Sequence, residues 1–538
     1  MCQERQAHAM FGRFRKKKER KVFVIGLDCG APELVFDRWR DHLPNLTRLA
    51  QGGLYGDLTS SIPCITVPAW SSMLSSKDPG TLGFYGFRNR ADYSYERMNI
   101  ATCAAVKEKR VWDYVGEAGK KSVLVGVPQT FPVPPVDGWL ISSFLTPNTT
   151  SARIQWTHPA DLRGEVERVL EGQTYDVDVP QFRTDDKDHL LEQIYAMTDK
   201  RFKVLNHLMR EKPWDFYMFV EMGIDRMHHA FWKYMDETHP KHVPGNPYQH
   251  AIRDYTVHVD RLVGELLAQL DDDTVVLVVS DHGATKMDGG ICVNEWLRRE
   301  GYLVLREEPR GEGIVPFIKA EVDWSKTRAW GAGGYYARIF MNVQGREPEG
   351  VIPPSEYERA RDELAARLAA IPDREGNPIH TVSYKPQEVY RTVRNIAPDL
   401  ITYFGDLNWR SLGSFGHGGI YVSENDTGPD DANHAPNGMF ILYDPRRQDG
   451  GRRLEGACPH LPSLANVRQD FPWQTSARTL GRSVPGELAE GACPELAEGA
   501  CPELAEGVQL MDVAPTILDA MGLPVPTDMQ GQVIGRTR

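Results

Sequence analysis

Short runs of consecutive apolar residues recur along the chain, and each ends at a polar or glycine position. Four of them have this form: Lys21–Asp28, Ser122–Gly126, Phe216–Val220 and Thr274–Ser280. Continuous rather than alternating apolar character is typical of strands that a parallel sheet buries on both faces. These runs therefore predict the central strands of a mostly parallel sheet.

Two longer segments, 188–209 and 248–270, show the apolar spacing of helices and lie between the predicted strands. Strands that alternate with amphipathic helices indicate an α/β fold with helices on both faces of the sheet. Ligands of such sheets bind beyond the carboxyl ends of the strands. Asp28, the segment Glu221–Asp225 and Asp281 lie at or just past three of these ends, so we expect them at one shared site.

The chain has 538 residues, which is too long for one small core, so we expect one large domain with insertions or two domains. The segment 311–381 has a different character and predicts an inserted cap or smaller subdomain. Within it, Trp330–Asn342 predicts a glycine loop entering a strand, and Pro354–Ile371 predicts a helix that starts at Pro-Ser. The catalytic core is expected over 21–310 and 382–446.

An eight-residue repeat interrupts the later part of the chain. Glu487–Pro494 recurs as Glu495–Pro502 and again in part as Glu503–Gly507. Internal glycine and proline suit neither a continuous helix nor a strand, and the units are too short and polar for a solenoid. We therefore expect a low-complexity insertion over 447–507, after which 508–538 returns to the core with a helix.

Composition and charge exclude some classes of function. Hydrophobic residues make up 41% and charged residues 25%, an ordinary globular balance, and the formal net charge is −12. This charge disfavours general nucleic-acid binding, so an anionic substrate needs local cations, which bound metals can supply. The sequence predicts no transmembrane segment and a basic disordered tail over 1–20. Eight cysteines without a C-x-x-C pair predict a reducing, cytoplasmic location.

Carboxylates and imidazoles gather in three short motifs. Asp225 and His229 are four residues apart, which places both on one face of a helix, whereas His228 points about a quarter-turn away. Asp281-His282 follows a buried strand, where a charged pair needs a partner. His434 is a single histidine and is informative only in combination with the others. Together these residue types are the ligands that zinc-like ions prefer.

A candidate nucleophile lies in the Pro-flanked segment Ile62–Ser72. A hydroxyl at a helix N-terminus, such as that of Thr66, suits an anionic phosphoryl group. An alcohol is a weak nucleophile unless a base or a metal lowers its pKa. The structural alternative is that Thr66 is a helix N-cap.

In this ordered combination the chain resembles the alkaline phosphatase superfamily, and within it the type I phosphodiesterase/nucleotide pyrophosphatase-like branch. The matching pieces are Gly26-Leu-Asp28, Thr66-Val-Pro-Ala-Trp70, Asp225-x-x-x-His229, Ser280-Asp-His-Gly283, His434 with Gly438, and Asp512-Val-Ala-Pro-Thr-Ile-Leu518. The resemblance implies an α/β/α sandwich with a smaller inserted cap. It also implies hydrolysis of small phosphorylated substrates, most closely nucleotide-like phosphodiesters or pyrophosphates.

Carried over residue by residue, the resemblance implies two sets of ligands for two divalent ions, Zn²⁺ first and Mn²⁺ second. One set is Asp225, His229 and His434, and the other is Asp28, Asp281 and His282. Thr66 lies beside the second set and forms a phosphothreonine intermediate.

Some features depart from the family pattern and leave alternatives open. Diesterases of this branch have an Asn after the nucleophile helix that binds a phosphate oxygen; here Asn89 lies slightly later and is the candidate, with Arg88 as the other. Phosphomonoesterase or cofactor-independent phosphomutase activity therefore stays open, as does a non-catalytic scaffold. Sulfatase chemistry is disfavoured because the motif after Thr66 lacks the required Arg, and Thr cannot give formylglycine.

Overall fold

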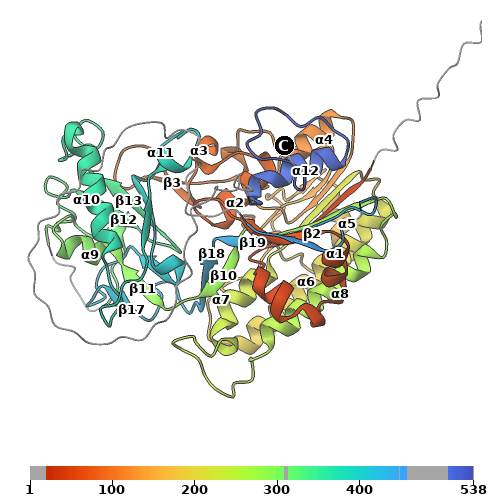
Figure 1. The fold of residues 1–538 in the computed structure, drawn as a ribbon, viewed down its shortest axis with the longest axis horizontal. Coiled ribbons are helices and arrows are strands. Elements are labelled where there is room, and N and C mark those ends of the chain that lie inside the picture. Colours follow the sequence, from red (N-terminus) through yellow and green to blue (C-terminus); the bar gives the residue numbers. More distant parts are fainter. Residues whose placement is uncertain (1–19, 308–312, 448, 457–506, 537–538) are drawn as a thin grey trace, which may run out of the picture.

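The computed structural model describes residues 20–307, 313–447, 449–456 and 507–536. It consists of a larger unit, in which a central sheet lies between two layers of helices, and a smaller unit beside it (Figure 1). The predicted basic tail and the eight-residue repeat fall almost wholly outside the described residues. No helix within the described ranges is long and apolar enough to cross a membrane.

The central sheet has nine strands among the described residues. Their spatial order is β20 (Arg452–Leu454), β2 (Leu54–Thr59), β19 (Asn437–Tyr443), β9 (Val275–Val279), β1 (Val22–Leu27), β8 (Phe216–Glu221), β5 (Ser122–Val125), β6 (Gly138–Ile141) and β7 (Thr157–His158). The five from β9 to β6 run parallel, whereas β19 is antiparallel to both of its neighbours. The predicted α/β fold with a mostly parallel sheet is confirmed, and the four predicted apolar runs are β1, β5, β8 and β9.

Helices cover both faces of this sheet. One layer contains α1 (Pro44–Gly52), α5 (Leu162–Val169), α6 (Lys187–Glu211), α7 (Gly223–Met235) and α8 (Ala251–Leu267); the other contains α2 (Thr66–Ser75), α4 (Val111–Glu117) and α12 (Val513–Ala520). Side chains of β1 alternate between the two cores, with Phe23 and Ile25 in one and Val22 and Val24 in the other. This double burial is the reason that β1 is a continuous apolar run.

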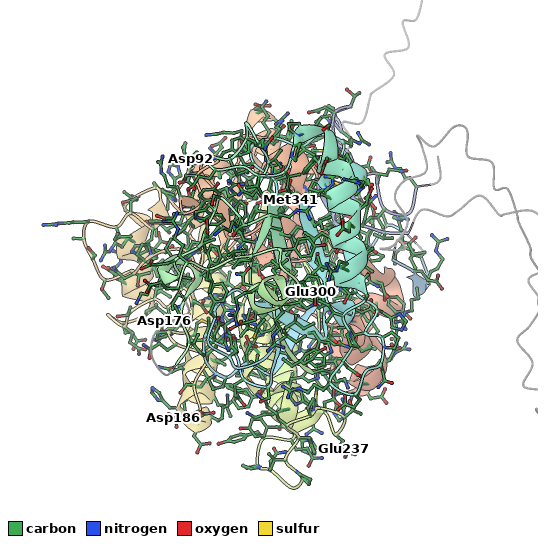
Figure 2. All side chains as sticks on the ribbon, turned by 90° about the vertical axis from the view of Figure 1, so that its left-hand side faces the viewer. Asp92, Asp176, Asp186, Glu237, Glu300 and Met341 are labelled. Carbon is green, nitrogen blue, oxygen red and sulfur yellow. The ribbon has the colours of Figure 1, made fainter. Side chains whose placement is uncertain are left out.

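The smaller unit is built on two further sheets, and Figure 2 looks onto it, with Met341 at the end of β13 labelled. One sheet has the order β12 (Ala329–Ala332), β13 (Ala337–Met341), β15 (Leu400–Tyr403), β14 (Val382–Tyr384); the other has the order β16 (Trp409–Leu412), β11 (Gly289–Cys292), β17 (Tyr421–Val422). Helices α9 (Val293–Arg299) and α10 (Tyr357–Ala369) pack on them. The smaller unit extends beyond the predicted range 311–381. Its strand β11 precedes that range, and its strands β14, β15, β16 and β17 follow it.

A two-stranded ribbon connects the large sheet to the segment that carries the last histidine of the predicted site. β10 (Gly283–Lys286) pairs antiparallel with β18 (Ala432–Ala435), and Ala284 lies opposite His434. Because β10 begins directly after Asp281-His282, this register brings residues about 150 positions apart in the sequence to the same edge of the sheet.

Candidate metal centre

Two groups of three side chains each place one ligand atom per residue within 4.8 Å of the others. One group, here called the first trio, is Asp225, His229 and His434; the other, the second trio, is Asp28, Asp281 and His282. All six residues are buried, with at most 2% of the surface of each exposed. The structure therefore brings together the six residues that the resemblance proposed as ligands, in the same two sets.

The fold explains why these residues meet. β9, β1 and β8 are neighbours with parallel directions, so their carboxyl ends open at one edge of the sheet. Asp28 follows β1, Asp281 follows β9, and Asp225 lies in the first turn of α7, directly after β8. His434 reaches the same edge on β18. The order of the strands therefore brings the three carboxylates to this edge, and the ribbon of β10 and β18 brings the imidazole of His434 there.

Within each trio a carboxylate oxygen faces a histidine Nε2. In the first trio, Asp225 Oδ1 lies 3.2 Å from His229 Nε2 and 3.8 Å from His434 Nε2. In the second, His282 Nε2 lies 3.1 Å from Asp281 Oδ2 and 3.9 Å from Asp28 Oδ1. The rings of His282 and His434 stack with 3.7 Å between their centroids, so the two trios adjoin.

The other nitrogen of each imidazole is engaged by an oxygen acceptor. His282 Nδ1 lies 3.1 Å from the Gly283 carbonyl, and His434 Nδ1 lies 3.1 Å from the Cys64 carbonyl. His229 Nδ1 lies 2.8 Å from Asp430 Oδ1. Because these oxygens accept, each Nδ1 carries the hydrogen and donates it. Nε2 is then the atom that each ring presents to the centre, which is the arrangement of metal-binding histidines.

The three carboxylates each have one oxygen in a hydrogen bond outside the trio and one that faces a histidine Nε2 within it. Asp28 Oδ2 accepts a hydrogen bond from Trp70 Nε1 (2.7 Å), Asp281 Oδ1 accepts one from the Cys29 amide (3.2 Å), and Asp225 Oδ2 accepts one from Arg226. The second oxygens, Asp28 Oδ1, Asp225 Oδ1 and Asp281 Oδ2, are buried and, apart from the histidine Nε2 atoms of their own trios, have no hydrogen-bond partner among the described residues. A buried, unpaired carboxylate oxygen is costly unless it meets a cation. These carboxylate oxygens and imidazole nitrogens fit a divalent ion such as Zn²⁺ or Mn²⁺.

The pKa values reflect the crowding of acidic groups. Burial and the nearby Asp225 raise the pKa of Asp28 well above its usual value, and burial and Asp28 do the same for Asp281. A bound cation relieves both effects. Burial lowers the pKa of His282 to about 4 and that of His434 well below its usual value, which keeps these rings in the neutral form that binds metals.

His229 differs from the other two histidines. Burial lowers its pKa, but Asp225 and Asp430 outweigh burial and raise it to about 9. The extra proton lies on Nε2, toward Asp225 Oδ1. A cation bound by the first trio takes the place of this proton, so binding releases it.

Thr66 is the first residue of α2, and Ile65 occupies the N-cap position. This arrangement contradicts the alternative in which Thr66 is the cap. The Thr66 hydroxyl lies 3.4 Å from His282 Nε2, and the side chain is 5% exposed. The amide groups of the first helical turn lack intrahelical partners, so this end of α2 favours an anion such as a phosphoryl group.

Asn89, the predicted phosphate-binding residue, makes hydrogen bonds to the backbone nearby. Its Oδ1 accepts a hydrogen bond from the Tyr85 amide at 2.6 Å, and its Nδ2 donates to the Gly86 carbonyl at 2.9 Å. Both ends of the side chain therefore stabilise the local turn that leads into β3 (Arg88–Arg90). Phosphate binding by Asn89 stays a prediction, and these two hydrogen bonds give the residue a structural role beside it.

Sequence reasoning missed the residues that surround the first trio. Tyr335, in the hairpin between β12 and β13, stacks its ring on His229 with 4.9 Å between centroids and donates a hydrogen bond to Asp430 Oδ2 at 3.1 Å. Arg183 donates to the same oxygen at 3.0 Å. Asp430 lies four residues before His434, and this short distance in the sequence could have indicated a shared site. No motif in the sequence indicates Tyr335 or Arg183.

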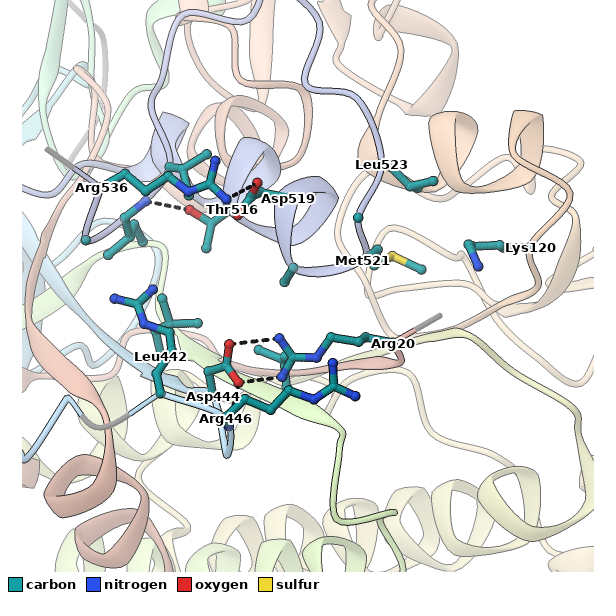
Figure 3. A pocket seen from close by; sticks show the side chains of 17 residues that line it. Arg20, Lys120, Leu442, Asp444, Arg446, Thr516, Asp519, Met521, Leu523 and Arg536 are labelled. Carbon is teal, nitrogen blue, oxygen red and sulfur yellow. Dashed lines mark hydrogen bonds and ion pairs between the residues drawn. The ribbon is translucent and has the colours of Figure 1, made fainter. Parts of the chain in front are cut away.

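A cavity of ≈ 590 Å³ lies at the opposite edge of the sheet, where Val275 begins β9 (Figure 3). The six ligand residues are absent from the described residues that line it. Its arginines are paired with acids, among them Arg20 with Asp444 and Arg536 with Asp519. This cavity is therefore separate from the metal centre.

The comparisons with known proteins agree with the geometry. A model of the family described as type I phosphodiesterase/nucleotide pyrophosphatase matches residues 22–430. A segment of the chain is 27% identical over 92 residues to GPI ethanolamine phosphate transferase 3 of Saccharomyces cerevisiae. That match covers 17% of this chain and 8% of the yeast protein, so the chain spans a small part of this curated relative.

One solved structure shows the same fold at low sequence identity, and another is similar over most of the chain. Phosphonoacetate hydrolase from Sinorhizobium meliloti 1021 superposes with a TM-score of 0.51 and 16% identity, covering 84% of this chain and 93% of that one. Murine ectonucleotide pyrophosphatase/phosphodiesterase 5 gives a TM-score of 0.44 and 13% identity, covering 81% and 92%. The chain and phosphonoacetate hydrolase thus share a fold.

Proposed function

The chain belongs to the type I phosphodiesterase/nucleotide pyrophosphatase family of the alkaline phosphatase superfamily and is a phosphoric ester hydrolase, and from this premise we propose the finer details of its reaction. The substrate is a small phosphodiester or pyrophosphate, of which nucleotide-like compounds are the first candidates. Thr66 is the nucleophile and carries a phosphothreonine intermediate. The two trios hold two divalent ions, Zn²⁺ first and Mn²⁺ second.

One observation supports this proposal above the others: of the five buried carboxylate oxygens without a hydrogen-bond partner among the described residues, three belong to the two trios. Asp28 Oδ1 and Asp281 Oδ2 face His282 Nε2, which also lies 3.4 Å from the Thr66 hydroxyl. A buried cluster of three carboxyl groups and three imidazoles offers an anionic substrate little favourable charge unless cations are bound. The residues thus suit metal-assisted phosphoryl chemistry better than a passive scaffold.

When bound, the two ions neutralise phosphoryl charge and lower the pKa of oxygen nucleophiles. The chain supplies the rest. Thr66 Oγ1 loses its proton and forms a bond to phosphorus as the bond to the leaving oxygen breaks, and the leaving oxygen takes up the proton, which gives the phosphothreonine. Water then forms a new bond to phosphorus, the Thr66 bond breaks, and the hydroxyl regains its proton. Two displacements give retention at phosphorus, and the first-turn amides of α2 orient the phosphoryl oxygens in both.

The proposal is tested by comparing initial rates on an aryl phosphodiester, an aryl phosphomonoester and an aryl sulfate, each with added Zn²⁺ or Mn²⁺. The expected order is diester above monoester, with sulfate turned over least. A preference for the monoester overturns the diester assignment while keeping the hydrolase, and fastest turnover of the sulfate overturns phosphoryl chemistry. A chelated sample of the same preparation is the control.

We also propose a cytoplasmic location. The support is that Cys29, Cys64, Cys103 and Cys292, the cysteines within the described residues, are all buried and unpaired. Unpaired thiols are typical of a reducing compartment.

A further inference from the structure

The peptide groups on either side of Cys64 are held from two sides of the protein. Its amide donates a hydrogen bond to the hydroxyl of Tyr403 at 2.9 Å, and its carbonyl accepts one from His434 Nδ1 at 3.1 Å. Cys64 lies two residues before Thr66, in the loop that leads into α2. A residue of the smaller unit and a ligand of the first trio therefore fix the same short piece of backbone beside the nucleophile.

Tyr403 is well suited to hold this amide. It is the last residue of β15 and is 4% exposed. Its ring packs against Tyr384 with 5.2 Å between centroids and against Tyr336 with 6.3 Å. Burial raises the pKa of the Tyr403 phenol well above its usual value, so the hydroxyl stays neutral and remains a hydrogen-bonding group. Packing thus restricts the ring, and the ring fixes the position of the oxygen.

A second tyrosine of the smaller unit holds the same loop further upstream. The hydroxyl of Tyr390 donates a hydrogen bond to the Ile62 carbonyl. Tyr390 is also buried, and it belongs to the apolar cluster that contains Cys64, Ile65 and Tyr403. Two phenol hydroxyls of the smaller unit therefore form hydrogen bonds with backbone groups of the loop. Because the side chains of the loop do not take part in these bonds, the anchoring depends on the path of its backbone.

We propose that Tyr403 is a positioning residue for the nucleophile, through which the smaller unit sets the place of Thr66 Oγ1 relative to the two trios. The inference rests on the proposed function, since Thr66 must be the nucleophile for its placement to govern the chemical step. The amide and carbonyl of Cys64 are held by Tyr403 and His434, so one anchor comes from each unit. A nucleophile misplaced by about 1 Å loses up to about 100-fold in rate, so such a clamp is a strong determinant of turnover.

The test is Tyr403→Phe, which removes the hydroxyl and keeps the ring. We expect kcat on the aryl phosphodiester to fall by about 10- to 100-fold. KM should stay within about twofold and the metal content should be unchanged, because the ligands and the substrate contacts are untouched. Tyr390→Phe should lower kcat in the same way. It also serves as the second variant if Tyr403→Phe gives no folded protein.

Tyr217→Phe is the matched control. The Tyr217 side chain is fully buried in β8 and donates a hydrogen bond to the Leu205 carbonyl at 2.9 Å. This variant also loses a buried phenol hydroxyl, but away from the nucleophile loop. It should lower the melting temperature and leave kcat unchanged. If kcat falls equally in Tyr217→Phe and Tyr403→Phe, in step with melting temperature, the role of Tyr403 is structural and the inference is overturned.

Thr66→Ala, measured in the same assay, separates this inference from the proposed function. Wild-type turnover in Thr66→Ala refutes the nucleophile assignment and both proposals with it. An inactive Thr66→Ala together with unchanged kcat in Tyr403→Phe and Tyr390→Phe refutes the positioning role alone. Loss of kcat in the two tyrosine variants, with full metal content and an unaffected Tyr217→Phe, supports it.

Discussion

Asp430 Oδ1 lies 2.8 Å from His229 Nδ1, and this contact orients one ligand of the first trio. Asp430 is fully buried, and its other oxygen accepts hydrogen bonds from Arg183 and Tyr335. Burial raises the pKa of Asp430, but His229, Arg183 and Arg410 outweigh it and hold the pKa below its usual value. The group is therefore a carboxylate that fixes the tautomer and the plane of the imidazole.

Replacing Asp430 by Asn should weaken metal binding without changing the ligands. We expect about 10- to 100-fold lower affinity, because partners of this kind contribute that much in known metal sites. Equilibrium dialysis against buffered Zn²⁺ measures it. Asp260→Asn is the control, since Asp260 is a buried acid that accepts hydrogen bonds from Leu46 and Asn45 away from the site. Equal affinity in Asp430→Asn and the wild type contradicts the orienting role.

Removing the metal ions should inactivate and destabilise the protein together. Chelation leaves the carboxylates of both trios buried and unpaired, so the melting temperature should fall and the activity should be lost. Both should return when Zn²⁺ or Mn²⁺ is added back. Differential scanning fluorimetry, elemental analysis and rate measurement on the same samples check this. Full activity in a sample that elemental analysis finds free of metal argues against the two-metal assignment.

The indole nitrogen of Trp70 should contribute to the stability of the protein and to metal binding by the second trio. Trp70→Phe removes the hydrogen bond to Asp28 Oδ2 (2.7 Å) and leaves a buried carboxylate without either partner. We expect unfolding in urea to show a loss of about 1–3 kcal/mol, together with weaker metal binding by the second trio. Trp156→Phe is the control, because Trp156 Nε1 donates to the Thr149 carbonyl at 3.1 Å, away from the trios. If metal affinity falls equally in both variants, the loss is a general effect of removing a buried indole N–H, and the specific role of Trp70 is contradicted.

The repeat insertion should be dispensable. The repeat lies outside the described residues, but the chain on either side of it comes together: the Val508 amide donates to the Glu455 carbonyl at 3.2 Å, and Gly456 bridges to Val508. A loop whose ends already meet can be shortened at little cost in entropy. Deleting residues 487–506 should leave the melting temperature and kcat nearly unchanged. Insoluble protein would show that the repeat is structural.

The sequence predicted the parts of the molecule that have local signals. Each of β1, β5, β8 and β9 is an apolar run because both of its faces are buried, and a polar residue at a strand end marks the site edge. The six candidate ligands could be proposed from the sequence because each lies in a short motif and because the order of the motifs is specific to a superfamily.

The parts that sequence reasoning missed depend on contacts between distant segments. The smaller unit extends beyond 311–381 because β13 pairs with β15, about 60 residues later, and no periodicity reveals such a pairing. The residue type of Asn89 indicated phosphate binding, and the hydrogen bonds of its amide to the turn at Tyr85 and Gly86 were missed. Tyr403 acts on a backbone amide far away in the sequence, so composition gives no hint of it.

The measurement that tests the central claim most directly is rapid acid quenching during turnover of an aryl phosphodiester, followed by peptide mass spectrometry. The account predicts a phosphoryl adduct on Thr66 that appears before steady state and disappears when the substrate is exhausted, and no adduct in Thr66→Ala. Steady turnover with no adduct on Thr66, or wild-type turnover in Thr66→Ala, would contradict the account.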